Sequence, residues 1–267
     1  MSEQTAASTS IYPCALESLP TGVFSDGHYE VRFARDEQDL DAILRLRFEV
    51  FNLELGEGLE ESYESGRDRD EFDSICHHLM VINTATDELV GTYRMQTSEM
   101  AARYRGFYSQ QEFRLDQLPR EVLASALEVG RACVAENHRN TLTLFQLWRG
   151  LALYVATNRK RYLFGCSSLT SQDPVEARAV MDLLERRNNL HPVFCVDPQP
   201  EYACYDENFV GDPGFKAKIP TLFRIYLRHG AKVCGPPAID RQFKTIDYLV
   251  IFDVDAMDPA MFKTYFE

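Results

Sequence analysis

The sequence predicts an α/β (α+β) fold in which a mixed, mostly antiparallel twisted sheet carries helices on both faces. The first observation is a strand-helix-strand unit, with strand-forming residues over Leu127–Val134, an apolar stripe at helical spacing over Leu144–Tyr154, and a second strand over Tyr162–Ser168. A right-handed crossover would make the two strands parallel neighbours. The second observation is a hairpin, because Cys76–Asn83 and Glu88–Gln96 have strand composition and flank a short polar turn.

The other predicted elements extend this core along the chain. Tyr29, Val31 and Phe33 alternate with charged residues and predict a first strand. Apolar residues at helical spacing predict a helix over Asp36–Leu55, with Asp36 as its N-cap. After the central unit, the pattern predicts two helices and two strands, at Pro174–Asn188, Pro220–His229, Lys232–Pro237 and Tyr248–Val254.

Length and composition indicate one domain over residues 28–267, preceded by an arm over residues 1–27 that shows no periodicity. A net charge of −13 argues against a general nucleic-acid binder and against simple electrostatic attachment to an anionic membrane. Seven cysteines without a Cys-x-x-Cys pair indicate reduced thiols rather than disulfides or a zinc site. No apolar run approaches the ~18 residues of a membrane span, and no signal pattern opens the chain, so we expect a cytoplasmic protein.

Two charged residues stand inside the central strand. A carboxylate and a guanidinium in a buried strand are costly unless paired, so Glu128 and Arg131 are either functional groups or a buried ion pair that stabilises the core. Strict alternation would place them on opposite faces of the strand. A β-bulge at Gly130 would bring both to one face and free a backbone N–H group.

The polar turn before the central helix, residues 137–143, is a candidate anion site. Asn140, Thr141 and Thr143 are candidate N-caps, and the first turn of the helix presents free N–H groups and the positive end of the helix dipole. The turn contains no glycine.

These motifs resemble a known family. Glu-x-Gly-Arg-x-Cys-Val at 128–134, with Arg-Asn at 139–140 and Gln-Leu-Trp-Arg-Gly-Leu at 146–151, is similar to the GNAT superfamily, in the branch that forms ornithine lipids and related N-acyl amino acids. That branch is similar in turn to acyl-homoserine lactone synthases. The resemblance runs from about Arg47 to Val254 and implies a GNAT-like fold; its other segments are Leu-Arg-Phe-Glu-Val-Phe at 46–51, Asp-x-Phe-Asp at 70–73, Val-Gly-Thr-Tyr-Arg-Met at 90–95 and the closing segment 240–247.

The resemblance implies catalytic roles for Glu128 and Arg131. In the similar families, the glutamate that matches Glu128 is proposed to take a proton from the attacking amine through water, and such general-base help contributes about 10²–10⁴-fold. Direct transfer needs no covalent nucleophile, which agrees with the absence of a Gly-x-Ser-x-Gly motif.

Four further residues are implied to bind the amino-acid acceptor. Asp70 and Asp73 would receive its ammonium groups, although a turn-forming pair of aspartates is the structural alternative. Arg94 is either a site residue or part of an ion pair, for example with Asp73. Arg47 either shapes the acyl or acceptor pocket or rests its aliphatic stem on the core with its head in water.

The glycine-free turn bears on the acyl donor. Relatives that use acetyl-coenzyme A cradle its pyrophosphate in a glycine-rich turn, so this turn favours the branch whose donor is acyl-[acyl carrier protein], a phosphopantetheine thioester. Binding of that group is assigned to Val134, Arg139, Asn140, Thr141 and Thr143. We expect no bound cofactor and no metal.

The predicted function is therefore N-acylation. The enzyme would transfer a 3-hydroxylated acyl chain to the α-amine of an amino acid, foremost L-ornithine, and form a lyso-ornithine lipid. Glycine or tyrosine as acceptor, lactone-signal synthesis, and a non-catalytic module that binds acyl groups or carrier protein are the alternatives. The expected partners are acyl carrier protein and the amino acid, with no nucleic acid and with a peripheral contact at the inner face of the cytoplasmic membrane left open.

Overall fold

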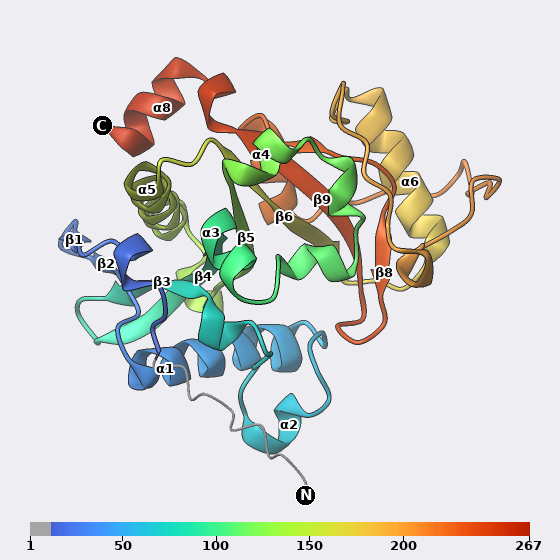
Figure 1. Cartoon of the computed structure of the whole chain (residues 1–267). Coiled ribbons are helices and arrows are strands. Elements are labelled where there is room, and N and C mark those ends of the chain that lie inside the picture. Colours follow the sequence, from blue (N-terminus) through green and yellow to red (C-terminus); the bar gives the residue numbers. More distant parts are fainter. Residues whose placement is uncertain (1–11) are drawn as a thin grey trace, which may run out of the picture.

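The computed structural model describes residues 12–267. Within them, the strands form a nine-stranded sheet in the order β1-β2-β3-β4-β5-β6-β9-β7, and β8 pairs with β9 (Figure 1). Every neighbouring pair is antiparallel except β5 and β6. The strands are β1 (Phe24–Ser25), β2 (Tyr29–Phe33), β3 (His77–Asn83), β4 (Glu88–Thr97), β5 (Ala126–Val134), β6 (Tyr162–Leu169), β7 (Lys232–Val233), β8 (Ala238–Asp240) and β9 (Thr245–Asp253).

The central strand-helix-strand unit is confirmed. Helix α5 (Thr141–Asn158) links β5 to β6, which run parallel, and the hairpin of β3 and β4 pairs with β5 on its other side. Asn140 caps α5, since its side-chain oxygen accepts from the Thr143 N–H. The sheet is thus mixed and mostly antiparallel, as predicted.

Helices cover both faces of the sheet. On one face α1 packs against β3, β4 and β5, and on the other face α5 packs against β2, β3 and β4. Helix α3 packs against β4 and β5, and its Met100 contacts Tyr154 of α5. The C-terminal helix α8, which the sequence pattern did not indicate, lies against α5 (Figure 1). The helices are α1 (Glu37–Arg47), α2 (Ser62–Ser65), α3 (Ser98–Arg103), α4 (Arg120–Ala124), α5, α6 (Pro174–Arg186), α7 (Thr221–Arg228) and α8 (Pro259–Phe266). Among the described residues, none of these helices has the length and apolarity needed to cross a bilayer.

The predicted helix over Asp36–Leu55 has two parts. Asp36 caps α1 as predicted, accepting from the N–H groups of Gln38 and Asp39, but the α-helix ends at Arg47 and continues as a π-helix over Phe48–Glu54. The wider π turns change the direction of the side chains that follow. Arg47 remains fully buried, and Phe51 comes to lie against Arg131 of β5.

The C-terminal half differs from the prediction at one point that matters for the site. The segment 240–247, predicted as a connection between strands, is a hairpin in which β8 ends at Asp240 and β9 begins at Thr245. Asp247 therefore lies inside the sheet. Of the predicted strand Lys232–Pro237, only Lys232–Val233 is extended and paired. The part of the predicted arm that the structure describes, residues 12–27, includes β1, which pairs with β2.

Candidate active site

A β-bulge gives β5 its unusual shape. Arg94 of β4 lies opposite Gly130, whereas Thr92 lies opposite Cys133, so β5 carries one extra residue between these pairs. Arg131 occupies it with φ = 49°, in the left-handed region, one position beyond the glycine that the sequence indicated. Arg131 thereby lies on the α1 side of the sheet, the side that Glu128 also faces.

The parallel pairing of β5 and β6 ends beside this bulge. Their ladder covers Ala126, Leu127 and Glu128, which pair with Tyr162, Leu163 and Phe164. A Cβ atom on Gly165 would lie 2.1 Å from the Val129 carbonyl oxygen, so a side chain at this point would force the strands apart. Beyond it the strands separate, and a cavity of about 340 Å³ opens between them.

Glu128 sits where the strands separate and lines this cavity. Its side chain accepts hydrogen bonds from the backbone N–H groups of Tyr108, at 2.6 Å, and Ser109, at 2.7 Å, and from the Ser109 hydroxyl. Burial raises the pKa of Glu128, and the Ser109 and Tyr108 donors oppose that rise only in part. The predicted alternative, a direct Glu128–Arg131 pair, is absent from the ion pairs of residues 12–267, where Arg131 pairs with Asp68 instead.

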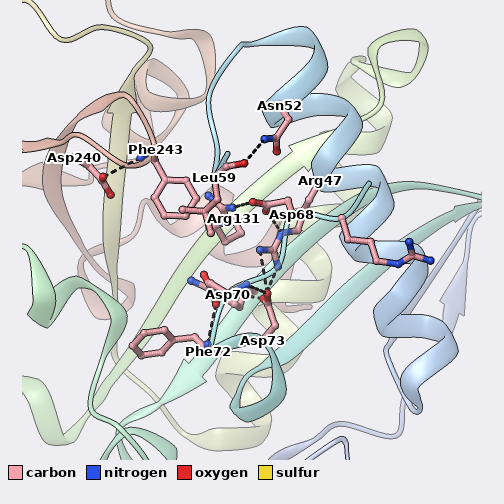
Figure 2. A network of polar contacts seen from close by, with 12 residues as sticks. Arg47, Asn52, Leu59, Asp68, Asp70, Phe72, Asp73, Arg131, Asp240 and Phe243 are labelled. Atoms are coloured by element: carbon pink, nitrogen blue, oxygen red, sulfur yellow. Dashed lines mark hydrogen bonds and ion pairs between the residues drawn. The ribbon is translucent and has the colours of Figure 1, made fainter. Parts of the chain in front are cut away.

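The other predicted charges form a continuous network, part of which Figure 2 shows around Arg47, Asp68 and Asp73. Arg47 is fully buried and donates to Asp68 at 2.7 Å and to Asp73 at 2.5 Å. Arg94 donates to Asp70 at 2.6 Å and to Asp73 at 3.1 Å. Burial alone would raise the pKa of Asp73, but Arg47, the hydrogen bond to His78 and Arg94 hold that pKa well below its usual value.

This network bears on the predicted acceptor site. Both oxygens of Asp73 are bonded within the network, Asp70 pairs with Arg94, and neither carboxylate lines the cavity. The arrangement gives no support to a direct role of Asp70 and Asp73 in holding a substrate ammonium group. Arg47 also lies away from the cavity wall and acts on it through Asp68 and Arg131, whereas Arg94 contributes to the wall directly.

The residues predicted to bind the phosphopantetheine surround the start of α5. Thr141 is its exposed first residue, Thr143 is buried, and Asn140 holds the cap. The guanidinium of Arg139 donates to both oxygens of Glu54, at the end of the π-helix, and to the carbonyl oxygen of Val134. Arg139 therefore ties the turn to the π-helix, with its charge already paired.

The cavity has two chemically different parts. The polar part, on the α1 side, is lined by Glu57, Arg94, Gln96, Glu128, Arg131, Asp240 and Asp247. The apolar part, on the α5 side, is lined by Tyr93, Met95, Trp148, Leu151, Phe223, Tyr226 and Phe252. Because the opening between β5 and β6 joins them, the cavity passes through the sheet.

The sequence did not single out three of the buried acids or Gln96. Asp240 and Asp247 belong to a motif noted only for its resemblance, and Glu112 lies in an aromatic stretch that gave no signal. Gln96 lies opposite Glu128 on β4, and both polar atoms of its buried amide lack a partner within residues 12–267. Only the fold brings Gln96, Asp240 and Asp247 to one cavity and places Glu112 beside the two aspartates.

Comparison with known proteins agrees with this geometry. Residues 46–149 match the acetyltransferase (GNAT) domain family. The chain is 31% identical over 247 residues to the L-ornithine N(alpha)-acyltransferase of Rhizobium meliloti (strain 1021), covering 88% of this chain and 83% of that protein. It is also 31% identical over 251 residues to the L-ornithine N(alpha)-acyltransferase of Brucella abortus (strain 2308), covering 90% and 89%.

Among solved structures, the chain resembles two acyl-homoserine lactone synthases. The match to LasI has 12% identity and a TM-score of 0.44 and covers 85% of this chain and 90% of LasI. The match to MesI has 10% identity and a TM-score of 0.49 and covers 88% of this chain and 92% of MesI. The coverage and identity of the two ornithine acyltransferases are high enough to show kinship. The chain belongs to the L-ornithine N(alpha)-acyltransferase family of GNAT proteins and is an acyltransferase.

Proposed function

We propose that this enzyme transfers a 3-hydroxylated acyl chain from acyl-[acyl carrier protein] to the α-amine of L-ornithine and so forms a lyso-ornithine lipid. The observation that carries the proposal is the cavity through the sheet, with Glu128 at the opening and an apolar chamber behind it. An acyl chain in the chamber would hold its thioester at the opening, where the amine could reach it from the polar side. The names of the similar proteins suggest ornithine as the acceptor.

The chemistry follows from the groups at the opening. The neutral α-amine attacks the thioester carbonyl and forms the C–N bond, the tetrahedral intermediate collapses with cleavage of the C–S bond, and the leaving thiolate takes up the proton that the amine has lost. Glu128, in its ionised form, accepts the proton that the amine must lose, directly or through water, and a raised pKa makes it a stronger base. The unpartnered amide of Gln96, opposite Glu128, is available to donate to the carbonyl oxygen while its charge develops.

The chamber also contains polar atoms that suit a hydroxylated chain. The buried indole N–H of Trp148 has no partner among the residues that the structure describes, and the hydroxyls of Tyr93 and Tyr226 contact each other in the wall. A buried donor without a partner is costly, and a 3-hydroxyl group could relieve that cost. This supports a hydroxylated donor over a plain acyl chain.

Carrier protein as the donor is supported by the turn at residues 137–143, which offers no glycine for a pyrophosphate. A peripheral contact with the inner face of the cytoplasmic membrane fits a product with one acyl chain. Exposed leucines at 53, 55 and 142 lie beside the Glu54–Arg139 pair and could make that contact.

The test uses purified protein, 3-hydroxyacyl-carrier protein and the same chain on coenzyme A, each with ornithine, glycine or tyrosine. Mass spectrometry should find N-α-acyl-ornithine as the main product, formed far faster from carrier protein. If acyl-glycine or acyl-tyrosine is the main product, that amino acid and not ornithine is the acceptor. Equal rates with the two donors would reject the assignment of carrier protein as the donor. Binding of acyl-carrier protein without any acylation would favour the non-catalytic alternative. Lipids of a host that expresses the chain provide an independent check.

A further inference from the structure

An acidic trio lies beside the catalytic opening. It consists of Glu112, Asp240 and Asp247, whose nearest carboxylate oxygens all lie within 4.8 Å of one another. The side chains are nearly inaccessible, with exposed fractions of 1%, 5% and 4%. Glu112 follows the turn that Glu128 holds, Asp240 ends β8, and Asp247 lies near the start of β9.

The trio is not neutralised within the part of the chain that the structure describes. None of its members takes part in an ion pair with any lysine or arginine of residues 12–267. Glu112 Oε1 and Asp247 Oδ1 are buried there without any hydrogen-bond partner. Burial and the neighbouring carboxylates raise the pKa of Glu112 well above its usual value, and burial raises that of Asp247 to about 6. Such a cluster is costly unless a cation enters it.

Two members of the trio line the cavity, because Asp240 and Asp247 belong to the same wall as Glu128 and Arg131. The Phe243 ring lies 4.3 Å from the Arg131 guanidinium carbon, and the Phe243 N–H donates to Asp240 at 2.9 Å. Figure 2 shows the Phe243 side chain between Arg131 and Asp240. The Arg131 Nε is buried and unpartnered within residues 12–267. One wall thus offers an anion-binding group and, next to it, a cation-binding one.

We propose that Glu112, Asp240 and Asp247 bind the side-chain ammonium of a dibasic amino-acid acceptor, while Arg131 binds its α-carboxylate. This assignment rests on the proposed function and names its acceptor subsite. With both ends held, the α-amine is directed to Glu128 at the opening. Neutral amino acids of the same length leave the buried carboxylates unpaired, so the trio selects against them.

The experiment compares ornithine with norvaline, which has the same carbon chain but no δ-amine. Both kcat/KM with the acyl donor and calorimetric binding without it are measured, on wild type, Asp247→Asn and Glu112→Gln. Wild type should prefer ornithine by at least about a hundredfold. Either substitution should reduce that preference at least tenfold and leave the norvaline rate equal or higher. Asp116→Asn, an exposed carboxylate of the same segment, makes the same charge change and should leave the preference intact.

Three results separate the possibilities. Acylation of ornithine with an unchanged ornithine preference in both variants overturns the trio and leaves the proposed function standing. Ornithine binding that both variants abolish, without acylation by wild type, supports the trio and rejects the proposed function. Stabilisation of wild type by Mg²⁺, Mn²⁺ or Ca²⁺, lost in Asp247→Asn and with no effect of ornithine, overturns the trio in favour of a metal site. If one variant fails to fold, Asp240→Asn, which keeps the oxygen that the Gln242 and Phe243 N–H groups use, replaces it in the same comparison.

Discussion

Two groups of buried ionisable residues lie on the same face of the sheet, and they differ in whether their members are paired with groups of opposite charge. The network of Arg47, Asp68, Asp73 and Arg94 has all its charges paired, among themselves and with Asp70 and Arg131, and of these four residues only Arg94 lines the cavity. The acidic trio consists only of carboxyl groups, keeps two oxygens unpartnered within residues 12–267, and reaches the cavity through Asp240 and Asp247. The first group therefore fixes the geometry of the site, whereas the second group still has unpartnered oxygens that can bind a ligand.

The difference has an energetic basis. Buried ion pairs contribute little net stability over apolar residues, yet the loss of one partner leaves a buried charge uncompensated. The network therefore tolerates substitution poorly, although it need not contact a substrate. The trio already bears that cost in the empty enzyme, so removal of one of its charges should relieve strain and reduce binding at the same time.

The largest effect is expected in the network. Asp73→Ala should lower the free energy of unfolding by about 3–5 kcal/mol, because Arg47, Arg94 and His78 lose a shared buried partner. Denaturant unfolding measures this loss. Asp41→Ala, which removes a half-exposed partner of Arg45 and Arg67, should cost less than about 1 kcal/mol. Equal losses in the two variants would show that the network is not the structural support described here.

At Glu128, substitution should affect catalysis more than folding stability. Glu128→Gln keeps the size of the side chain but removes the base and one of the two oxygens that accept from the Tyr108 and Ser109 N–H groups, so turnover should fall at least about a hundredfold, or about 2.7 kcal/mol of activation free energy. Initial rates from pH 6 to 9 test this, with circular dichroism as the control for folding. A rate near that of wild type across this range would reassign Glu128 to the support of the Tyr108–Ser109 turn.

The trio should be visible in the pH dependence of stability. The pKa of Asp247 is about 6 in the folded protein, above its ordinary value of 3.8, and Glu112 and Asp240 face it. Since the unfolded chain releases this proton first, folding stability falls as pH rises from about 4 to about 6. Asp247→Asn should remove this decline, raising stability above pH 6 by about 3 kcal/mol relative to wild type. Thermal unfolding of both proteins at pH 4, 5, 6 and 7 gives the difference. Parallel curves would mean that Asp247 is already charged at low pH.

The smallest effect concerns the donor. Arg139 is paired with Glu54, so Arg139→Ala should lower the rate with carrier protein only about two- to tenfold and leave the coenzyme A rate unchanged. Arg161→Ala, at the opposite end of α5, provides a matched loss of charge. Rates at increasing ionic strength complete the test. A wild-type carrier-protein rate insensitive to both salt and Arg139 would remove the docking role.

Sequence patterns predicted the order of the central elements because apolar periodicity records which face of each strand and helix is buried. The Asp36 and Asn140 caps were visible for a similar reason, since capping uses neighbours in the chain. The predicted alternative of an Arg94–Asp73 ion pair is confirmed, at 3.1 Å. The pairing of Asp70 with Arg94 and of Asp73 with Arg47 was not visible, because these partners lie 24 and 26 positions apart along the chain. Likewise, the trio combines Glu112, from a turn before β5, with two residues of the last hairpin. No local sequence pattern predicts a contact between segments so far apart along the chain.

The short ladder between β5 and β6 has a further consequence, for the way the protein unfolds. Within residues 12–267, the backbone ladder that joins the half of the sheet with β1 to β5 to the half with β6 to β9 has only three residue pairs. The two halves are otherwise connected through packed side chains and contacts such as that of Tyr93 with Tyr226. Amide hydrogens of Val129–Val134 that point into the gap should exchange with solvent much faster than those that bond to β4, in an alternating pattern. An acyl chain in the gap would contact both halves and slow this exchange. The substrate would then complete the hydrophobic core, and the loaded enzyme would unfold as one cooperative unit at a higher temperature.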